Sequence, residues 1–597
     1  MADYVTEPFD GLPFGSPEKS RRYATERYNG AVGLNWWSCD PTLQFLMRVN
    51  LGDDGLRWAQ PHLERVGALM GGKVAARAEE TDRNPPQLEK FDRWGRDISR
   101  VVHPDSFVAS KSDLIRESFS SSSFVEEAHR ARVDPAPLNA AWSYMLDQAE
   151  IGMACVLGTG LDMVVRMAER FAPEDVRARV AELAGDGNDL AGATAQMFTE
   201  RTGGSDLAAL ETTATLAGDA WLLNGLKWFV SNVDGSAYVV LAKPEGGPDG
   251  TRGVAPFLVL RERRDGSPNG VRVRRLKDKL GTKAVASAEV ELVDAEAFLL
   301  APAPGQTESS EDGPHDGRGL GRMMELTNGA RLGIAMMGVG VARRALVESL
   351  CYARARDAFG RALIEQPLMQ RKLADLIVEV EAAQALVFDG YLGPRLRIGA
   401  PLIKLRAARL GITAASDAIE VHGGNGYIEQ WPVARLLRDA QVNTVWEGPD
   451  NILCLDVRRA IEKNAGHEAL LERIGAALDH APVLGSSVDQ ATVDLVSQRA
   501  GHLRQAIEAW QRLDGAVAEA RLFPLAQYMV DVYAAALLLE QAGAESQLVG
   551  AGRKSLIARL YARSHLADPG PLRRIDAPAE DIERFKELND GALIDQR

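Results

Sequence analysis

The spacing of hydrophobic residues predicts helices in the first third of the chain. Residues 41–192 place apolar side chains three and four positions apart, as in Leu43, Leu46 and Met47. That spacing follows one face of an α-helix. Residues 1–40 are polar and punctuated by Gly and Pro, so we interpret them as an N-terminal arm. The sequence therefore predicts an arm followed by a helical domain.

The pattern changes near Gly192, where short apolar runs separated by turns replace the helical spacing. Residues 237–241, 257–260 and 271–273 have the character of strands, and Asp265-Gly266 and Asn269-Gly270 have the character of turns. The economical interpretation of residues 193–300 is a small antiparallel β domain between two helical blocks.

Helical spacing returns after a polar stretch. Residues 301–320 are rich in Gly, Pro and acids, which is typical of a flexible acidic loop. Residues 321–465 are predicted to be helical, and 466–597 form a further helical stretch rich in Ala and Leu. The fold class predicted from these patterns is mainly α with a central β domain (α+β).

Composition and charge narrow the function classes. A chain of 597 residues exceeds one ordinary core, and its 46% hydrophobic and 25% charged content is that of a folded protein. Acids exceed bases by 83 − 69 = 14, which argues against general nucleic-acid binding. The four cysteines are far apart, so no zinc or disulfide framework is expected, and no other metal site is predicted.

The same survey of the sequence predicts a cytoplasmic, water-soluble protein. No signal peptide is apparent in residues 1–10. The most apolar stretches, 332–342 and 533–539, are shorter than a membrane span and fit buried helices.

One carboxylate stands out as a candidate catalytic group. Glu447 lies between Trp446 and Gly448, and a glycine-rich turn, residues 422–427, lies upstream. A carboxylate among apolar neighbours, followed by a glycine that admits a ligand, suits a general base beside a flat cofactor. The alternative is a surface acid at a helix start, where it would help satisfy free backbone amides.

Four separate motifs, in the same order, resemble the flavin-dependent acyl-CoA dehydrogenase family. They are Gln196–Asp206 (QMFTERTGGSD), Gly225–Asn232 (GLKWFVSN), Tyr352–Gly360 (YARARDAFG) with Gln366, and Trp446-Glu447-Gly448 after the glycine turn. The resemblance covers roughly residues 150–460. It implies an N-terminal helical domain, an antiparallel β-barrel-like domain and a C-terminal four-helix bundle.

The N-terminal third resembles the AidB subgroup of that family. The similarity rests on residues 84–88 (NPPQL), 92–96 (DRWGR) and 103–104 (HP), and on Arg438–Gly448 (RDAQVNTVWEG). Residues 466–597 are the least AidB-like part and are not placed by the resemblance.

The resemblance implies an enzyme that removes an α-proton from an acyl thioester and passes the β-hydrogen as hydride to FAD. Glu447 would be the base, because the other position used in the family is here Ala330, which cannot take a proton. The implied cofactor-binding residues are Gln196, Phe198, Thr199, Ser205, Phe229, Ser231, Arg356, Phe359, Gln366, Glu420, Gly423, Gly424 and Asn451. The implied substrate-binding residues are Ser205, Arg331, Glu447 and Gly448.

Several of these positions have alternative interpretations or depart from the family pattern. Arg356 is expected to bind the FAD pyrophosphate from a neighbouring subunit, or else to form a helix-surface salt bridge. Trp228 is expected to point away from Phe229 by strand alternation, as a core aromatic. Pro449 stands where the family has a Thr, so one FAD contact is missing, and Asn451 could replace part of it. His103 and His422 are predicted to be structural.

Expected partners are an acyl-CoA or acyl-carrier thioester, an electron-transfer flavoprotein or other acceptor, and further copies of the chain in a dimer or tetramer. AidB-type relatives are associated with DNA, so a DNA-protecting flavoprotein is a rival hypothesis, and nitroalkane oxidation is another. Residues 466–597 hold 14 basic and 19 acidic residues, a net of −5, which favours the enzyme. A smaller basic cluster comprises Arg553, Lys554, Arg559, Arg563, Arg573 and Arg574.

Overall fold

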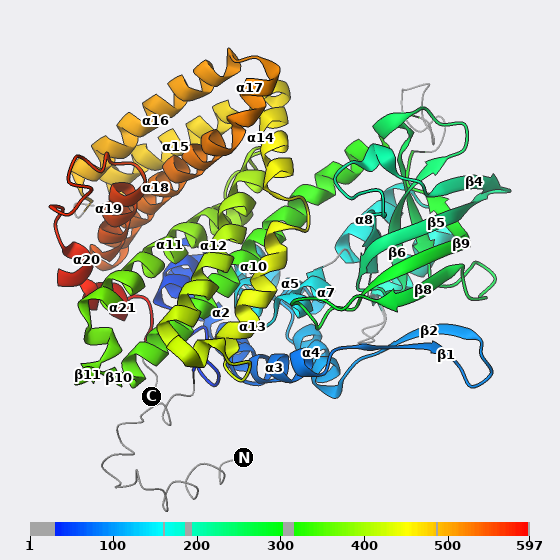
Figure 1. Ribbon diagram of the computed structural model, residues 1–597, viewed down its shortest axis with the longest axis horizontal. Coiled ribbons are helices and arrows are strands. Elements are labelled where there is room, and N and C mark those ends of the chain that lie inside the picture. The colour runs from blue at the N-terminus through cyan, green and yellow to red at the C-terminus, as the bar shows by residue number, and fades with distance from the viewer. Residues whose placement is uncertain (1–29, 159–160, 186–193, 303–315, 485–487, 595–597) are drawn as a thin grey trace, which may run out of the picture. The chain divides into compact units, whose positions relative to one another are not determined.

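The computed structural model describes residues 30–158, 161–185, 194–302, 316–484 and 488–594 (Figure 1). Contacts group the chain into two compact units. Unit 1 comprises Met1–Ala76, Ser118–Ala149 and Ile334–Arg597, and unit 2 comprises Arg77–Glu117 and Glu150–Gly333. Each unit draws on separate stretches of chain, so the units cut across the domain boundaries predicted from the sequence. Most of the predicted acidic loop, residues 303–315, lies outside the described residues.

Unit 2 is built around a seven-stranded sheet that closes into a barrel. The strands are β3 (Thr194–Met197), β4 (Thr213–Ala217), β5 (Ala220–Ser231), β6 (Ala237–Pro244), β7 (Ala255–Leu260), β8 (Val271–Leu276) and β9 (Ser287–Leu299). The order β3-β6-β4-β5-β9-β7 closes because β7 also pairs with β6, and β8 pairs with β9. Most pairings are antiparallel, as predicted, but β6 pairs in parallel with both β3 and β4.

The barrel strands alternate between two hydrophobic cores. Side chains such as Tyr238, Val240 and Phe257 pack inside the barrel. Their neighbours Val239 and Leu258 pack outward against helices α8 (Leu161–Phe171) and α9 (Glu174–Gly185). Because both faces are buried, these strands are continuous apolar runs, which is why they could be recognised in the sequence.

A β-hairpin, which the sequence analysis did not predict, lies within the stretch predicted to be a helical domain. Strands β1 (Gln87–Phe91) and β2 (Asp97–Val102) pair with each other, and the Lys90 Nζ donates to the Val273 carbonyl of β8 at 2.6 Å. The remaining helices of unit 2 are α3 (Ala75–Arg83, shared with unit 1), α4 (Asp105–Arg116) and α7 (Ile151–Gly158), with 3₁₀ turns η4 (Leu207–Ala209) and η5 (Gly250–Gly253).

Unit 1 is helical. It contains α2 (Pro41–Leu69), the π-turn η3 (Met70–Val74), α5 (Ser122–Arg130), α6 (Pro135–Ala149), most of α10 (Gly319–Ala355), α11 (Pro367–Leu392), α12 (Gly399–His422), α13 (Pro432–Ala440), α14 (Asp450–Asn464), α15 (Gly466–Leu484), α16 (Gln490–Gln511), α17 (Gly515–Ala520), α18 (Leu522–Val549), α19 (Arg553–His565), α20 (Glu580–Glu583) and α21 (Phe585–Asp590). Short elements join them: strands β10 (Asp357–Ala358) and β11 (Arg361–Ala362) and 3₁₀ turns η6 (Leu363–Glu365), η7 (Gly423–Tyr427) and η8 (Gln441–Thr444). The mainly helical α+β class is confirmed.

Helix α18 forms the core of the C-terminal region that the sequence left unplaced. It packs against α15, α16 and α19 and also against α11, α12 and α14, and Figure 1 shows these helices side by side. By length and composition α18 is one helix apolar enough to cross a membrane, contrary to the sequence survey. However, 72% of its most apolar window is buried inside the structure, as in the core helix of a folded domain.

Candidate active site

Glu447 lies in a loop between η8 and α14, outside any helix. Pro449 is the N-cap of α14 and Asp450 supplies the acid of its first turn, so Glu447 does not have the helix-start role of the alternative interpretation. The Glu447 backbone is left-handed, with φ +52°, and Gly448 follows with φ +98°. A left-handed backbone costs a residue with a side chain roughly 1–2 kcal/mol, and such strain concentrates at functional sites.

Side-chain hydrogen bonds hold the residues on both sides of Glu447. The Trp446 Nε1 donates to the Asn443 Oδ1 at 3.1 Å, and Asn443 is fully buried. After the loop, Arg409 of α12 donates from Nε to the Asp450 carboxylate at 2.7 Å. The loop is therefore anchored to its surroundings before and after the candidate base.

The glycine turn and the end of α10 meet in unit 1. The Asn425 Nδ2 donates to the Tyr352 hydroxyl at 3.2 Å, and the rings of Tyr352 and His422 are 4.2 Å apart. His422 contacts the Ala418 carbonyl through Nδ1 at 2.7 Å, and burial lowers the pKa of His422. This buried, hydrogen-bonded histidine fits the structural role predicted for it.

Three predicted cofactor residues follow α10 in a tight hairpin. Arg356 comes directly after the helix, and among the described residues none forms an ion pair or hydrogen bond with its guanidinium. The alternative salt bridge is therefore not formed there. Phe359, at the tip of the β10–β11 hairpin, is 97% exposed with φ +54°. The Gln366 Nε2 donates to the Ala358 carbonyl at 3.1 Å, so this side chain is hydrogen-bonded to the backbone of the hairpin.

The other predicted cofactor residues of unit 1 are also at its surface. A Cβ added at Gly423 or Gly424 would meet no atom within 4 Å, so space is open on that side of the turn. The Glu420 carboxylate is mostly exposed and accepts from the Lys372 Nζ at 2.6 Å. Asn451 is exposed in the first turn of α14.

Six predicted residues of unit 2 lie on β3, on β5 and in the segment that follows β3. Gln196 is in β3, Phe198 packs partly into the outer core, and the Thr199 carbonyl accepts from the Trp228 N–H at 2.8 Å. Ser205 is exposed, and the Ser231 hydroxyl is 2.9 Å from that of Ser287.

A buried ion pair that sequence reasoning missed fixes this region. The Lys227 Nζ is 2.6 Å from the Glu200 Oε1 and also donates to the Leu241 carbonyl at 2.6 Å. Burial lowers the pKa of Lys227 to about 8, against the opposing attraction of Glu200. The available signal in the sequence was Lys227, the one charged residue of β5, together with the acid Glu200 in the preceding motif.

The predicted opposite orientation of Trp228 and Phe229 is wrong. The pairing of β5 with β9 shifts between Lys227 and Val230, which marks a β-bulge. The Lys277 Nζ lies 3.3 Å from the Trp228 ring centroid and 4.9 Å from that of Phe229. One cation therefore contacts both rings, because a bulge breaks the alternation of side chains along a strand.

Arg331 lies in α10 at the end of unit 2 and is buried, with its Nη1 3.1 Å from the Asn328 Oδ1.

The predicted site residues form two groups, one in each unit. Glu447, Gly448, Arg356, Phe359, Gln366, Glu420, Gly423, Gly424 and Asn451 belong to unit 1, and Gln196, Phe198, Thr199, Ser205, Phe229, Ser231 and Arg331 belong to unit 2. In the described part of the chain, no group of three or more His, Cys, Asp or Glu residues could hold a metal ion.

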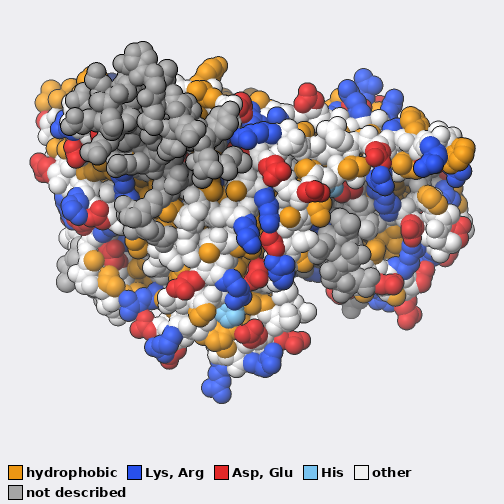
Figure 2. Space-filling model, turned by 90° about the horizontal axis from the view of Figure 1, so that it is seen from below, with side chains coloured by type: hydrophobic (Ala, Val, Ile, Leu, Met, Phe, Trp, Pro, Cys, Tyr) orange, Lys and Arg blue, Asp and Glu red, His pale blue; other side chains and the backbone are white. Residues whose placement is uncertain are grey.

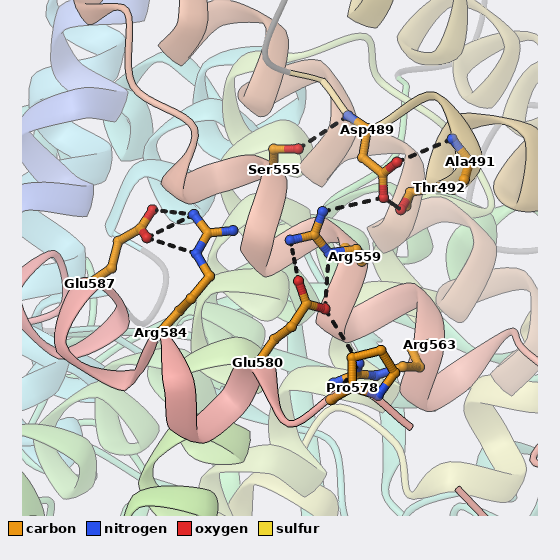
Figure 3. A network of polar contacts seen from close by, with 10 residues as sticks. All are labelled: Asp489, Ala491, Thr492, Ser555, Arg559, Arg563, Pro578, Glu580, Arg584 and Glu587. Atoms are coloured by element: carbon orange, nitrogen blue, oxygen red, sulfur yellow. Dashed lines mark hydrogen bonds and ion pairs between the residues drawn. The ribbon is translucent and has the colours of Figure 1, made fainter. Parts of the chain in front are cut away.

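The basic cluster of the C-terminal region is largely engaged in internal ion pairs. Glu381 holds Arg553 and Lys554, and Arg559 contacts both Glu580 and Asp489, as Figure 3 shows for the latter network. On the face drawn in Figure 2, basic and acidic side chains are interspersed over much of the surface. These cations therefore offer little free charge for nucleic-acid phosphates.

We expect no retardation of duplex DNA by this protein in a gel-shift measured from low to physiological salt. The physical reason is that cations already paired with carboxylates release few counterions from DNA. A shift that appears at low salt and fades as salt rises would contradict this expectation and restore the DNA-binding hypothesis.

Comparison with known proteins places this arrangement in a family. The acyl-CoA dehydrogenase middle domain matches residues 195–295 and the C-terminal domain of the same family matches 317–462. The adaptive response protein AidB N-terminal domain matches residues 28–173. The putative acyl-CoA dehydrogenase AidB of Escherichia coli is 30% identical over 70% of this chain and 77% of that protein. The chain belongs to the acyl-CoA dehydrogenase family.

Two further relatives of the family extend the similarity beyond residue 465. Acyl-CoA dehydrogenase family member 11 of Caenorhabditis elegans is 26% identical over 86% of this chain and 85% of that protein. The crystal structure of C. elegans ACDH-11 in complex with C11-CoA has a TM-score of 0.80 at 23% identity, covering 94% of this chain and 96% of that one. The coverage shows that this fold includes the C-terminal helical region.

Proposed function

We propose that this protein is an FAD-dependent acyl-CoA dehydrogenase that desaturates an acyl thioester between its α and β carbons. The observation that carries the proposal is the placement of Glu447: a carboxylate on a strained, left-handed residue, outside any helix, in a loop anchored on both sides. Family membership supports an oxidoreductase, and the base, substrate and reaction are our inference.

The residues of unit 1 fit FAD. Arg356 has no partner among the described residues, Phe359 is almost fully exposed, and Gly423 and Gly424 face open space. A free guanidinium binds a diphosphate in bidentate fashion, and bare glycine backbone allows its close approach. In unit 2, Gln196, Phe198, Thr199, Ser205, Phe229 and Ser231 would line the flavin. Pro449 offers no hydroxyl, and exposed Asn451 is the nearby polar side chain able to replace part of that contact.

When bound, FAD supplies the acceptor for the hydride that leaves the β-carbon. The chain itself would supply the base: the Glu447 carboxylate takes the α-proton, and the Glu447 N–H donates to the thioester carbonyl, where negative charge develops. Ser205, Arg331 and Gly448 are the other proposed substrate contacts. The negative charge of the enolate-like state would otherwise be too costly, because an α-C–H beside a thioester is a very weak acid.

Anaerobic bleaching of the flavin by thioesters tests this function. We expect the purified protein to be yellow and to be bleached by at least one acyl-CoA from a panel of different chain lengths, including the C11-CoA found in the C. elegans structure. A colourless protein that takes up no FAD on reconstitution would overturn the proposal. Bleaching by a nitroalkane and by no thioester would replace it with another carbon-acid oxidation.

Arg356→Ala is expected to weaken FAD binding by about tenfold or more. A hydrogen bond to a charged group contributes about 1.5–3 kcal/mol, and 1.4 kcal/mol is a factor of ten in affinity. FAD titration followed by flavin fluorescence measures the change. Arg371→Ala is the control, because that arginine lies on the exposed surface of α11 with Asp375. Equal FAD affinity in the Arg356 variant and the native protein would remove Arg356 from the site.

We further propose a homo-oligomer, a dimer or tetramer, with an electron-transfer flavoprotein or another acceptor reoxidising the flavin. Besides Phe359, the large apolar side chains of Leu368 and Tyr427 are more than four-fifths exposed in the same unit. Exposed aromatic and apolar side chains of this size favour a neighbouring subunit over water. Sedimentation at micromolar concentration would distinguish a monomer from either assembly.

A further inference from the structure

We propose that Lys404 is a positioning residue for the general base, acting through the backbone of the Glu447 loop. Lys404 lies in the second turn of α12 and is 0% exposed. Its Nζ donates to the carbonyl oxygen of Gly448 at 2.6 Å. The inference rests on the proposed role of Glu447 and adds a residue 43 positions earlier in the chain.

The buried ammonium of Lys404 is explained by the hydrogen bond that it donates. Removing a charged group from water is costly, and an apolar side chain of similar length would fill the same space without that cost. The buried neighbours of Lys404 along α12 include the apolar residues Leu402, Ile403 and Leu405. The hydrogen bond to Gly448 is a contact that a lysine makes here and a methionine would not.

The contact fixes a backbone segment that would otherwise relax. Glu447 and Gly448 both have positive φ, and a conformation of this kind persists only where the surroundings impose it. Lys404 holds the Gly448 carbonyl, Asn443 holds the Trp446 ring, and Arg409 holds Asp450. Of these three anchors, Lys404 is the one bonded to the backbone of the residue directly after Glu447, and in this proposal it helps to fix where the carboxylate points.

Loss of the hydrogen bond between Lys404 and Gly448 is expected to slow the transfer of the α-proton to Glu447. A catalytic group displaced by about 1 Å can lose on the order of 10²-fold in rate, because the reacting atoms no longer meet in line. Substrate and FAD would still bind, since Lys404 is buried under the loop and contacts neither in this proposal. We therefore expect Lys404→Met to lower kcat by ten- to a hundredfold with KM changed less than threefold.

The test measures turnover together with exchange of the thioester α-hydrogen for deuterium, each normalised to bound FAD. Exchange reports deprotonation alone, so Lys404→Met is expected to slow it as much as it slows kcat. Lys554→Met is the matched control: Lys554 is also buried, at 2% exposed, but pairs with Glu381 in the C-terminal region. That variant is expected to be less stable and to keep native exchange per bound FAD.

Lys404→Gln keeps the test decisive if the methionine variant does not fold. Glutamine is one bond shorter, so its amide falls outside hydrogen-bond reach of Gly448, while a neutral amide is less costly to bury. We expect at least a tenfold loss of kcat and of α-exchange in this variant. Native rates in either folded Lys404 variant would overturn the positioning role, whereas native exchange in Glu447→Gln would overturn the proposed function itself.

Discussion

Glu447→Gln is expected to lower turnover by at least about a hundredfold while the protein still binds FAD. General base catalysis contributes roughly 10²–10⁴-fold to enzyme rates, and the alternative base position of the family is Ala330 in this chain. Glutamine keeps the size of the side chain and its backbone preferences, so the anchored loop is retained. The side chain loses its negative charge and, with it, the ability to accept a proton.

Steady-state turnover and flavin absorbance of the same preparation measure this prediction. Glu462→Gln is the matched control, because Glu462 lies on α14 in a partly exposed pair with Arg458. We expect native turnover in the control and a native flavin spectrum in both variants. Turnover of Glu447→Gln within a factor of two of the native protein would show that another group removes the proton.

Barrel strands with both faces buried could be predicted from the sequence, whereas a largely exposed hairpin outside the barrel was missed. Runs such as 237–241 and 257–260 became β6 and β7 because a continuous apolar stretch between turns has few other solutions. The β1–β2 hairpin escaped because its strands are largely exposed and carry Glu89, Lys90 and Arg100 among few apolar residues. Its turn residues, Asp92 to Gly95, were the available signal.

In the candidate site, residues that belong to short motifs could be predicted from the sequence, whereas contacts between distant segments could not. Glu447, Arg356 and the glycine turn could be named because each belongs to a short motif. Lys404 could not, because its link to Gly448 depends on how α12 packs beneath the loop. The orientation of Trp228 failed for a related reason: strand alternation holds only while the register is unbroken, and a bulge interrupts it.

The C-terminal region, which the resemblance did not place, is tied to the rest of unit 1 by buried charges as well as by the packing of α18. Glu381 of α11 is 3% exposed, and its carboxylate contacts Arg553 at 2.5 Å and Lys554 at 2.7 Å. Both cations lie in the first turn of α19, where the helix dipole is unfavourable to positive charge. The carboxylate offsets that repulsion and ties α19 to α11.

Glu381→Gln is therefore expected to loosen this attachment by about 3–5 kcal/mol. Removing one partner of a buried ion pair leaves uncompensated charge, here two cations against a neutral amide. Hydrogen exchange of the α18 and α19 amides should accelerate by more than about a hundredfold, since local opening follows this free energy. Glu462→Gln, an exposed i,i+4 pair, should change exchange little. Unchanged protection of α19 in Glu381→Gln would contradict the anchoring role.

The same triad gives the attachment a defined acid dependence. Burial alone would raise the pKa of Glu381, but Arg553 and Lys554 lower it from 4.5 to about 2. A carboxyl whose pKa is lower when folded binds fewer protons than in the unfolded chain, so it stabilises the fold fully above pH 4.5. That contribution, about 3 kcal/mol, is lost as pH falls from 4.5 toward 2. Protection of α19 should decrease steeply across this window in the native protein and more gently in Glu381→Gln, because the variant has no carboxyl there to titrate.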